Sequence, residues 1–359
     1  IHKNRTYVHT MSNRQTNSKF QWQQRQTRRP LPLGRHMKQI PPAYMYVPVL
    51  GISGILAYGY YSCLDEAPLT KRKRLIATSP RFERQLGDEE YAKLLKQFKS
   101  KILPPEHRAC ITVRRVGSRI AEAGKKFSEE HLPPNSISSA PYTYTVVRSD
   151  MANAFVLPNN HVFVLTGLFK YARDEDELAA VMGHEMAHNL ARHVGEKVSN
   201  SFIISIIARL SLIFDPSGFL YMVFLPASAL LHDLPHSRDA EVEADHIGIH
   251  LAAEACYDPR AASRVFSAMK ESANCNRTSK MKRKDPPEFI STHPSYDSRL
   301  SNFEKWMPDA LAKFDADGGL KCQRIRGEMK LARKRAAELA ARRERMELGM
   351  SRPQHYDPF

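Results

Sequence analysis

The first 64 residues contain no aspartate or glutamate, although they carry nine lysines and arginines of a chain whose net charge is +16. Serine, threonine and glutamine separate the basic residues, and this composition is typical of a mitochondrial targeting region. A nucleic-acid-binding arm can have the same charge pattern. We do not expect nucleic acid as a partner, because a hydrophobic segment follows instead of a folded nucleic-acid-binding motif. We expect residues 1–42 to be a disordered tail in the matrix.

Residues 43–64 contain no charged side chain at all. At a rise of 1.5 Å per residue, a helix of this length matches the roughly 30 Å hydrocarbon core of a bilayer. Tyrosines lie near both ends, as at a membrane interface. We therefore predict one transmembrane helix, because disordered basic flanks offer no core in which to bury it. The flanking positive charges nearly balance, so orientation follows from targeting: the N-terminus in the matrix and the remainder in the intermembrane space.

The five cysteines lack the spacing of a zinc-binding motif, and their number is odd. A disulfide between two of Cys256, Cys275 and Cys322 is an open alternative in the intermembrane space. The sequence does not pair them.

A His-Glu-x-x-His motif begins at His184. Asp174 followed by Glu177 is a capping-box pattern, which predicts that a helix begins before the motif. On a helix His184 and His188 project from one face, so the two imidazoles can bind one zinc ion. Glu185 lies about 100° round the helix, where it can act as general base on a water. Two surface histidines on an amphipathic helix are the alternative interpretation.

A second acidic segment, Ser237–Asp245, can complete the site. Two histidines leave a tetrahedral zinc one protein ligand short. Glu241 and Asp245 are four residues apart and share a helix face, whereas Glu243 falls on another. We predict that Glu241 is the third ligand of one zinc ion per chain, and that Asp245 accepts a ring N–H from a ligand histidine. A solvated acidic face is the alternative.

His193 follows His188 by five residues, which turns it away from the ligand face of the helix. No glycine stands between them to reverse the chain. We therefore leave His193 out of the metal site.

Together these motifs resemble the Ste24/HtpX type of zinc metallopeptidases. Segment 153–168 resembles that family's hairpin before the metal helix, and Ser291–Pro294 with Arg299 resembles its late Thr-His-Pro element. The likeness extends over roughly residues 80–310. Three flanking segments resemble the mitochondrial inner-membrane branch, a stress-activated peptidase whose activity overlaps with the m-AAA protease: Glu83–Gly87, Ile102–Pro104 and Val113–Val116.

This resemblance implies an endopeptidase that cleaves inner-membrane proteins in stress response and quality control, a dynamin-like fusion GTPase among them. It also implies that Asn153, Ala154 and Phe155 form an edge strand to which an extended substrate adds, although from sequence alone they fit a core strand equally well. His293 near the zinc would donate to the oxyanion of the reaction, but a lone histidine before proline can equally be a structural cap.

The fold that we expect is α+β: a mainly helical, gluzincin-type metallopeptidase domain over residues 80–310, with a short β-sheet beside the active-site helix. A basic linker (65–79) precedes it and a basic helical tail (311–359) follows. Apolar spacing and β-branched or aromatic runs predict two helices and then three strands. They cover Glu89–Ile102, Ala109–Phe127, Tyr142–Arg148, Asn153–Leu157 and His161–Leu165.

A second apolar region covers residues 202–234 and is interrupted by Arg209 and Asp215–Gly218. Its pieces are too short to span a bilayer as a simple helix, so a membrane-associated hairpin and a core hairpin both stay open. The partners that we expect are membrane-protein substrates and inner-membrane lipid, including cardiolipin, drawn to the basic tail. A second copy of the chain is an open alternative.

Two other functions compete with this interpretation. A CAAX-type prenyl-protein peptidase shares the metal motifs, but it would need several long membrane spans. A non-catalytic membrane scaffold with a structural zinc would close the fourth metal position with a protein ligand, and it would have no use for Glu185.

Overall fold

The computed structural model describes residues 42–137, 140–223, 237–278, 289, 293 and 296–347. The predicted targeting tail, residues 224–234 of the apolar region, and Thr292 and Pro294 lie outside these ranges. Helix α1 (Pro42–Ser62) confirms that the uncharged segment is helical. The chain divides into two units within α1, residues 1–55 and 56–359. Whether α1 crosses a membrane stays a prediction.

The second unit is mainly helical, as expected. Its helices are α2 (Pro80–Phe98), α3 (Arg108–His131), α4 (Glu175–Leu190), α5 (His193–Phe214), α7 (Arg238–Glu254), α8 (Arg260–Thr278), α10 (Tyr296–Phe314) and α11 (Leu320–Glu347), with short 3-10 turns at Thr166–Lys170 and Ala316–Gly319. Its strands are β1 (Leu64–Glu66), β2 (Lys73–Leu75), β3 (Thr143–Val147), β4 (Ala154–Leu157) and β5 (His161–Leu165).

A three-stranded sheet of order β3-β5-β4 accompanies the helices. β5 pairs in parallel with β3 and antiparallel with β4. The outer side of β3 is covered, because Leu103 N–H donates to the Val146 carbonyl (2.9 Å) and Arg148 N–H to the Lys101 carbonyl (2.7 Å). In the part of the chain that the structure describes, no further strand pairs with β4. The edge available to another extended chain is therefore β4.

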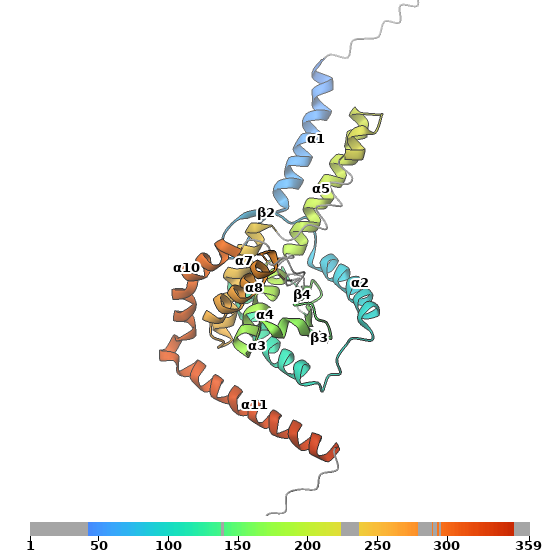
Figure 1. Cartoon of the computed structure of the whole chain (residues 1–359). Coiled ribbons are helices and arrows are strands. Elements are labelled where there is room, and N and C mark those ends of the chain that lie inside the picture. Colours follow the sequence, from blue (N-terminus) through green and yellow to red (C-terminus); the bar gives the residue numbers. More distant parts are fainter. Residues whose placement is uncertain are drawn as a thin grey trace, which may run out of the picture. The chain divides into compact units, whose positions relative to one another are not determined.

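Helix α4 forms the centre of the second unit, with α3, α7 and α8 packed on it and β4 beside it (Figure 1). Its first turn confirms the predicted cap: the Asp174 carboxylate accepts from Glu177 N–H (2.7 Å). Nearly every later residue of α4 is buried, so the histidine motif lies in the core of the unit and not on its surface.

Helices α4 and α7 approach each other through a pair of glycines. A Cβ on Gly248 would lie 2.9 Å from His184 N and 3.0 Å from His184 Cα, and a Cβ on Gly183 would lie 3.0 Å from the Gly248 carbonyl oxygen. These contacts are with backbone, which cannot rotate away. The absence of side chains at both positions lets the acidic segment of α7 come within reach of the α4 histidines.

Residues 65–79 are more ordered than a linker. β1 and β2 pair antiparallel, and the Arg74 side chain on β2 is buried and donates to the Ala191 carbonyl at the end of α4. Ala77 N–H donates to Ser199 on α5 (2.8 Å). Sequence composition indicated a basic linker because the carboxylates that pair with Arg72, Glu196 and Glu243, lie far along the chain.

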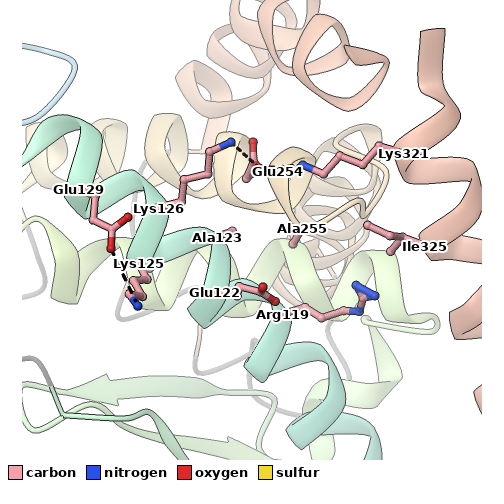
Figure 2. A pocket seen from close by; sticks show the side chains of 10 residues that line it. All are labelled: Arg119, Glu122, Ala123, Lys125, Lys126, Glu129, Glu254, Ala255, Lys321 and Ile325. Carbon is pink, nitrogen blue, oxygen red and sulfur yellow. Dashed lines mark hydrogen bonds and ion pairs between the residues drawn. The ribbon is translucent and has the colours of Figure 1, made fainter. Parts of the chain in front are cut away.

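The start of α11 is fastened to the rest of the second unit. A disulfide joins Cys256, just after α7, to Cys322 on α11. A pocket of about 340 Å³ lies at this junction, lined among others by Glu254, Lys126 and Lys321 (Figure 2). Lys126 (2.9 Å) and Lys321 (3.0 Å) both donate to Glu254. Arg326 on α11 binds Asp176 through two hydrogen bonds of 2.7 and 3.0 Å. Beyond this junction most of the described side chains of α11 are exposed.

Replacing Gly248 with alanine tests the glycine contact. The added methyl group would push α7 away from α4, so we expect a loss of about 3 kcal/mol in folding free energy and a melting temperature lower by roughly 5–10 °C. Bound zinc should fall as well. The control is Gly327→Ala on α11, where a Cβ meets nothing within 4 Å and alanine favours the helix. Equal melting curves for Gly248→Ala and wild type would contradict this account.

Candidate metal centre

Four buried side chains converge at one point between α4 and α7. The ligand atoms of His184, His188, Glu241 and His293 all lie within 4.8 Å of one another. The two Nε2 atoms of His184 and His188 are 3.1 Å apart, and Glu241 Oε1 lies 3.4 Å from His188 Nε2. The structure thus brings together the three residues that the sequence predicts as metal ligands.

His293 lies closer to the ligand atoms than its predicted role requires. Its Nδ1 is 2.9 Å from Glu241 Oε1 and 3.3 Å from His184 Nε2, and its Nε2 is 3.4 Å from Glu185 Oε1. His293 thus lies in the position of a fourth ligand. Sequence reasoning missed this role, because 52 residues separate Glu241 and His293 and spacing on a helix carries no information over that distance.

The donor set fits a metal ion. Glu241 Oε2 and Glu185 Oε1 are buried and form no hydrogen bond among the described residues. Their nearest charged or imidazole neighbours are His184 Nε2 (3.5 Å) and Arg299 Nη1 (3.7 Å) for Glu241, and His293 Nε2 (3.4 Å) for Glu185. A bound cation would satisfy both oxygens at shorter range. Imidazole nitrogen and carboxylate oxygen are typical zinc donors. The cluster is therefore a metal-binding His/Glu site of the type that zinc occupies.

The outer nitrogen of His184 is held by a carboxylate, as predicted. His184 Nδ1 lies 2.9 Å from Asp245 Oδ1. Arg299 donates to both oxygens of Asp245 (2.7 and 2.6 Å), and its guanidinium lies 4.1 Å from the ring centre of Phe266. Since Arg299 and Asp245 are almost fully buried, this pair fixes the His184 ring rigidly.

The outer nitrogen of His188 contacts a residue that sequence reasoning set aside. His193 Nδ1 lies 2.8 Å from His188 Nδ1, and His193 Nε2 lies 3.0 Å from Glu243 Oε2. The prediction that His193 points away was wrong, because Arg192 adopts a left-handed conformation (φ 55°) and reverses the chain without glycine. Arg192 is held there by Glu83, which lies 2.5 Å from its Nη2. His193 is still outside the ligand cluster.

The two glutamates at the centre differ in their protonation equilibria. Burial raises the pKa of Glu185 above its ordinary value, and the nearby His293 and His184 only partly oppose the rise. Burial acts on Glu241 in the same direction, but the His293 and His184 imidazoles outweigh it and hold the pKa of Glu241 well below its usual range. Glu241 therefore favours its ionised form, whereas Glu185 has the stronger affinity for a proton.

The predicted substrate strand lies beside this centre. Ala154 begins β4 and Asn153 directly precedes it, with α4 packed against the strand. The Ala152 carbonyl, just before β4, accepts from Phe289 N–H (3.1 Å), and the Phe289 ring stacks on His293 at 4.5 Å between centres. The start of the edge strand and His293 are thereby connected through one residue.

Comparison with known proteins agrees with this geometry. The family model described as "Peptidase family M48" matches residues 118–307. The "Mitochondrial metalloendopeptidase OMA1" of Schizosaccharomyces pombe is 33% identical over 255 residues, which cover 71% of this chain and 69% of that protein. Its Saccharomyces cerevisiae counterpart is 32% identical over 70% of this chain and 71% of its own.

The "Metalloendopeptidase OMA1, mitochondrial" of Homo sapiens is 31% identical over 70% of this chain and 47% of its own length. These matches favour a mitochondrial endopeptidase over a prenyl-protein peptidase and over a non-catalytic scaffold. The chain belongs to peptidase family M48 and, within it, to the OMA1-type mitochondrial metalloendopeptidases.

Proposed function

We propose that the protein is a membrane-anchored zinc endopeptidase of the mitochondrial inner membrane, with one zinc ion held by His184, His188 and Glu241. Bound zinc would polarise the scissile carbonyl and lower the pKa of a water. The observation that carries the proposal is the position of Glu185: a buried carboxylate next to the ligand cluster, with a raised pKa and no hydrogen-bond partner for its Oε1 among the described residues. A structural site has no use for such a group.

Glu185 is the general base in this proposal. Its carboxylate takes a proton from the attacking water and passes a proton to the leaving amine. The raised pKa makes Glu185 a stronger base toward the water than an ordinary carboxylate. Asp245 and Arg299 do not touch the substrate; they hold the His184 ring in place.

His293 has two roles in this proposal. In the described arrangement its Nδ1 lies with the ligand atoms, and four protein ligands would close the site to water. We propose that His293 withdraws from that position before hydrolysis. Its ring N–H then serves as a donor to the oxyanion, the role that the sequence predicts.

The substrate in this proposal is an extended segment of a membrane protein that adds to β4 as a further strand. Asn153, Ala154 and Phe155 supply the edge, and the pairing of residues 101–103 with β3 leaves β4 as the side of the sheet that no other described strand pairs with. Misfolded inner-membrane proteins and a dynamin-like fusion GTPase, as the resemblance implies, belong to this substrate class.

The proposed topology places residues 1–42 in the matrix, α1 across the inner membrane and the peptidase domain (80–310) in the intermembrane space. α1 contains no charged residue. The disulfide between Cys256 and Cys322 supports an oxidising compartment for the domain. Inner-membrane lipid such as cardiolipin remains the proposed partner of the basic tail (311–359), and self-association is a further proposal.

Glu185→Gln is the test of the proposed chemistry. The amide keeps the shape of the side chain but cannot accept a proton, so we expect zinc content to stay at one per chain and cleavage of a loosely folded, membrane-anchored reporter to fall by about 10³-fold or more. Both proteins would be purified in detergent and assayed side by side. Equal cleavage by wild type and variant would mean that another residue is the base or that the activity is a contaminant.

We also propose that the C-terminal part of α5, beyond residue 197, enters the membrane. The expectation of pieces too short to span a bilayer was wrong for this segment, because α5 begins at His193 and continues through Arg209 to Phe214. α5 is long and apolar enough to cross a bilayer, and few of its residues are buried in the domain. Beyond residue 197 its sole charge is Arg209, whose long side chain can reach the membrane surface. The hydroxyls of Ser201 and Ser205 donate to carbonyls of their own helix (3.0 and 2.9 Å), so they do not need water.

Tryptophan quenching distinguishes lipid from water around α5. Phe214 at the end of α5 is 84% exposed and Phe82 on α2 is 44% exposed, so Phe214→Trp and Phe82→Trp form a matched pair. In vesicles that contain lipids brominated on their acyl chains, we expect the added tryptophan of Phe214→Trp to be quenched. The added tryptophan of Phe82→Trp should not be quenched, so the bromine-dependent loss of fluorescence should be no larger than that of wild type. Equal signals from both variants would place the end of α5 in water.

A further inference from the structure

The connection between β1 and β2 reaches the metal centre through Arg72. We propose that Arg72 and Glu243 are positioning residues for the ligand His188 and that they act through His193. The β1–β2 hairpin then helps to position the metal ligands, in addition to connecting α1 with the peptidase domain. This inference rests on the proposed zinc site, and it concerns residues that neither the motif nor the family resemblance assigned.

Glu243 is the middle of the chain of contacts. It lies on α7 and is 1% exposed, so its charge must be neutralised by neighbours. Arg72 Nε donates to its Oε1 (2.7 Å) and Arg72 Nη2 to its Oε2 (3.2 Å), while the Thr70 hydroxyl also donates to Oε1 (2.9 Å). Two residues of one short connection therefore saturate Oε1, while Oε2, which accepts from Arg72 Nη2 and lies 4.0 Å from Arg74 Nη1, also faces His193 Nε2.

Arg72 also ties α5 to α7. Its Nη1 and Nη2 donate to the two oxygens of Glu196 on α5, both at 2.7 Å. A planar guanidinium matches a carboxylate in two places at once, which a lysine cannot do. Because Glu196 and His193 lie on the same first turn of α5, this clamp sets where the His193 ring stands between Glu243 and His188.

The hydrogen bonds along this path run in one direction. His188 faces the ligand cluster with Nε2, so its Nδ1 carries the hydrogen and donates to His193 Nδ1 (2.8 Å). His193 must then carry its own hydrogen on Nε2 and donate it to Glu243 (3.0 Å). Arg72 and Thr70 both donate to Glu243, so its oxygens act as acceptors toward His193 as well, and this direction of the hydrogen bonds leaves the His188 Nε2 lone pair free for a metal.

The other ligand histidine has the same kind of support in a shorter form. His184 Nδ1 contacts Asp245 directly, and Arg299 binds both oxygens of Asp245. Each ligand ring thus ends on a buried carboxylate that an arginine holds. The two arginines differ in their place in the chain. Arg299 lies on α10, whereas Arg72 lies in the connection between β1 and β2, shortly after α1 ends at Ser62.

Zinc affinity of the full chain in detergent tests this inference, measured by competition with a chromogenic chelator. We expect His193→Ala to bind zinc 10–100-fold more weakly than wild type, and Arg72→Met about tenfold more weakly. The double variant should be no weaker than His193→Ala alone, because Arg72 acts through His193. The matched control is Arg326→Met, which removes a two-bond arginine–carboxylate pair at the α11 junction; its zinc affinity should equal that of wild type.

Two results would overturn the inference: wild-type affinity in Arg72→Met, or losses that multiply in the double variant, as expected of independent structural damage. If circular dichroism shows that Arg72→Met does not fold, Arg72→Lys takes its place, since it keeps the charge but not the planar fork. An intermediate loss of affinity supports the inference and unchanged affinity contradicts it. A wild-type chain that binds no zinc would refute the proposed function itself, so the two failures are distinguishable.

Discussion

The close approach of α4 and α7 at Gly183 and Gly248 is the contact on which the rest of the centre depends. Without it, Glu241 on one helix could not come within 3.4 Å of His188 on the other. The three-stranded sheet, the β1–β2 hairpin and α10 then contribute further residues around this pair of helices. The histidine motif is thus a property of one helix, but the metal site is a property of two helices held at backbone contact.

Burying so many ionisable groups is unfavourable unless each one is paired. The structure meets this demand in layers: ligand atoms at the centre, carboxylates or an imidazole behind the two rings, and arginines behind the carboxylates. Asp245 with Arg299 serves one ring, and Glu243 with Arg72 serves the other through His193. Removing the residues of one layer leaves a charged group without a partner in the apolar interior, so the centre and the fold around it are stabilised together.

Sequence predicts what depends on local spacing. The ligands His184, His188 and Glu241, and the outer carboxylate Asp245, follow from residues four apart on helices, and the three strands follow from β-branched runs. The parts that sequence missed depend on tertiary contacts or on backbone choices without a marker: His293 among the ligand atoms, the chain reversal at Arg192, and the arginines of residues 65–79. A left-handed residue that is not glycine leaves no local signal, because distant partners stabilise it.

X-ray absorption at the zinc edge of the purified full chain tests the central claim most directly. The account predicts one zinc per chain with only nitrogen and oxygen ligands at about 2.0–2.1 Å, and the outer-shell scattering of at least two imidazoles. That scattering should weaken in His188→Ala. Sulfur ligands at about 2.3 Å, or a zinc shell without imidazole, would show that the metal binds elsewhere and would contradict the centre described above.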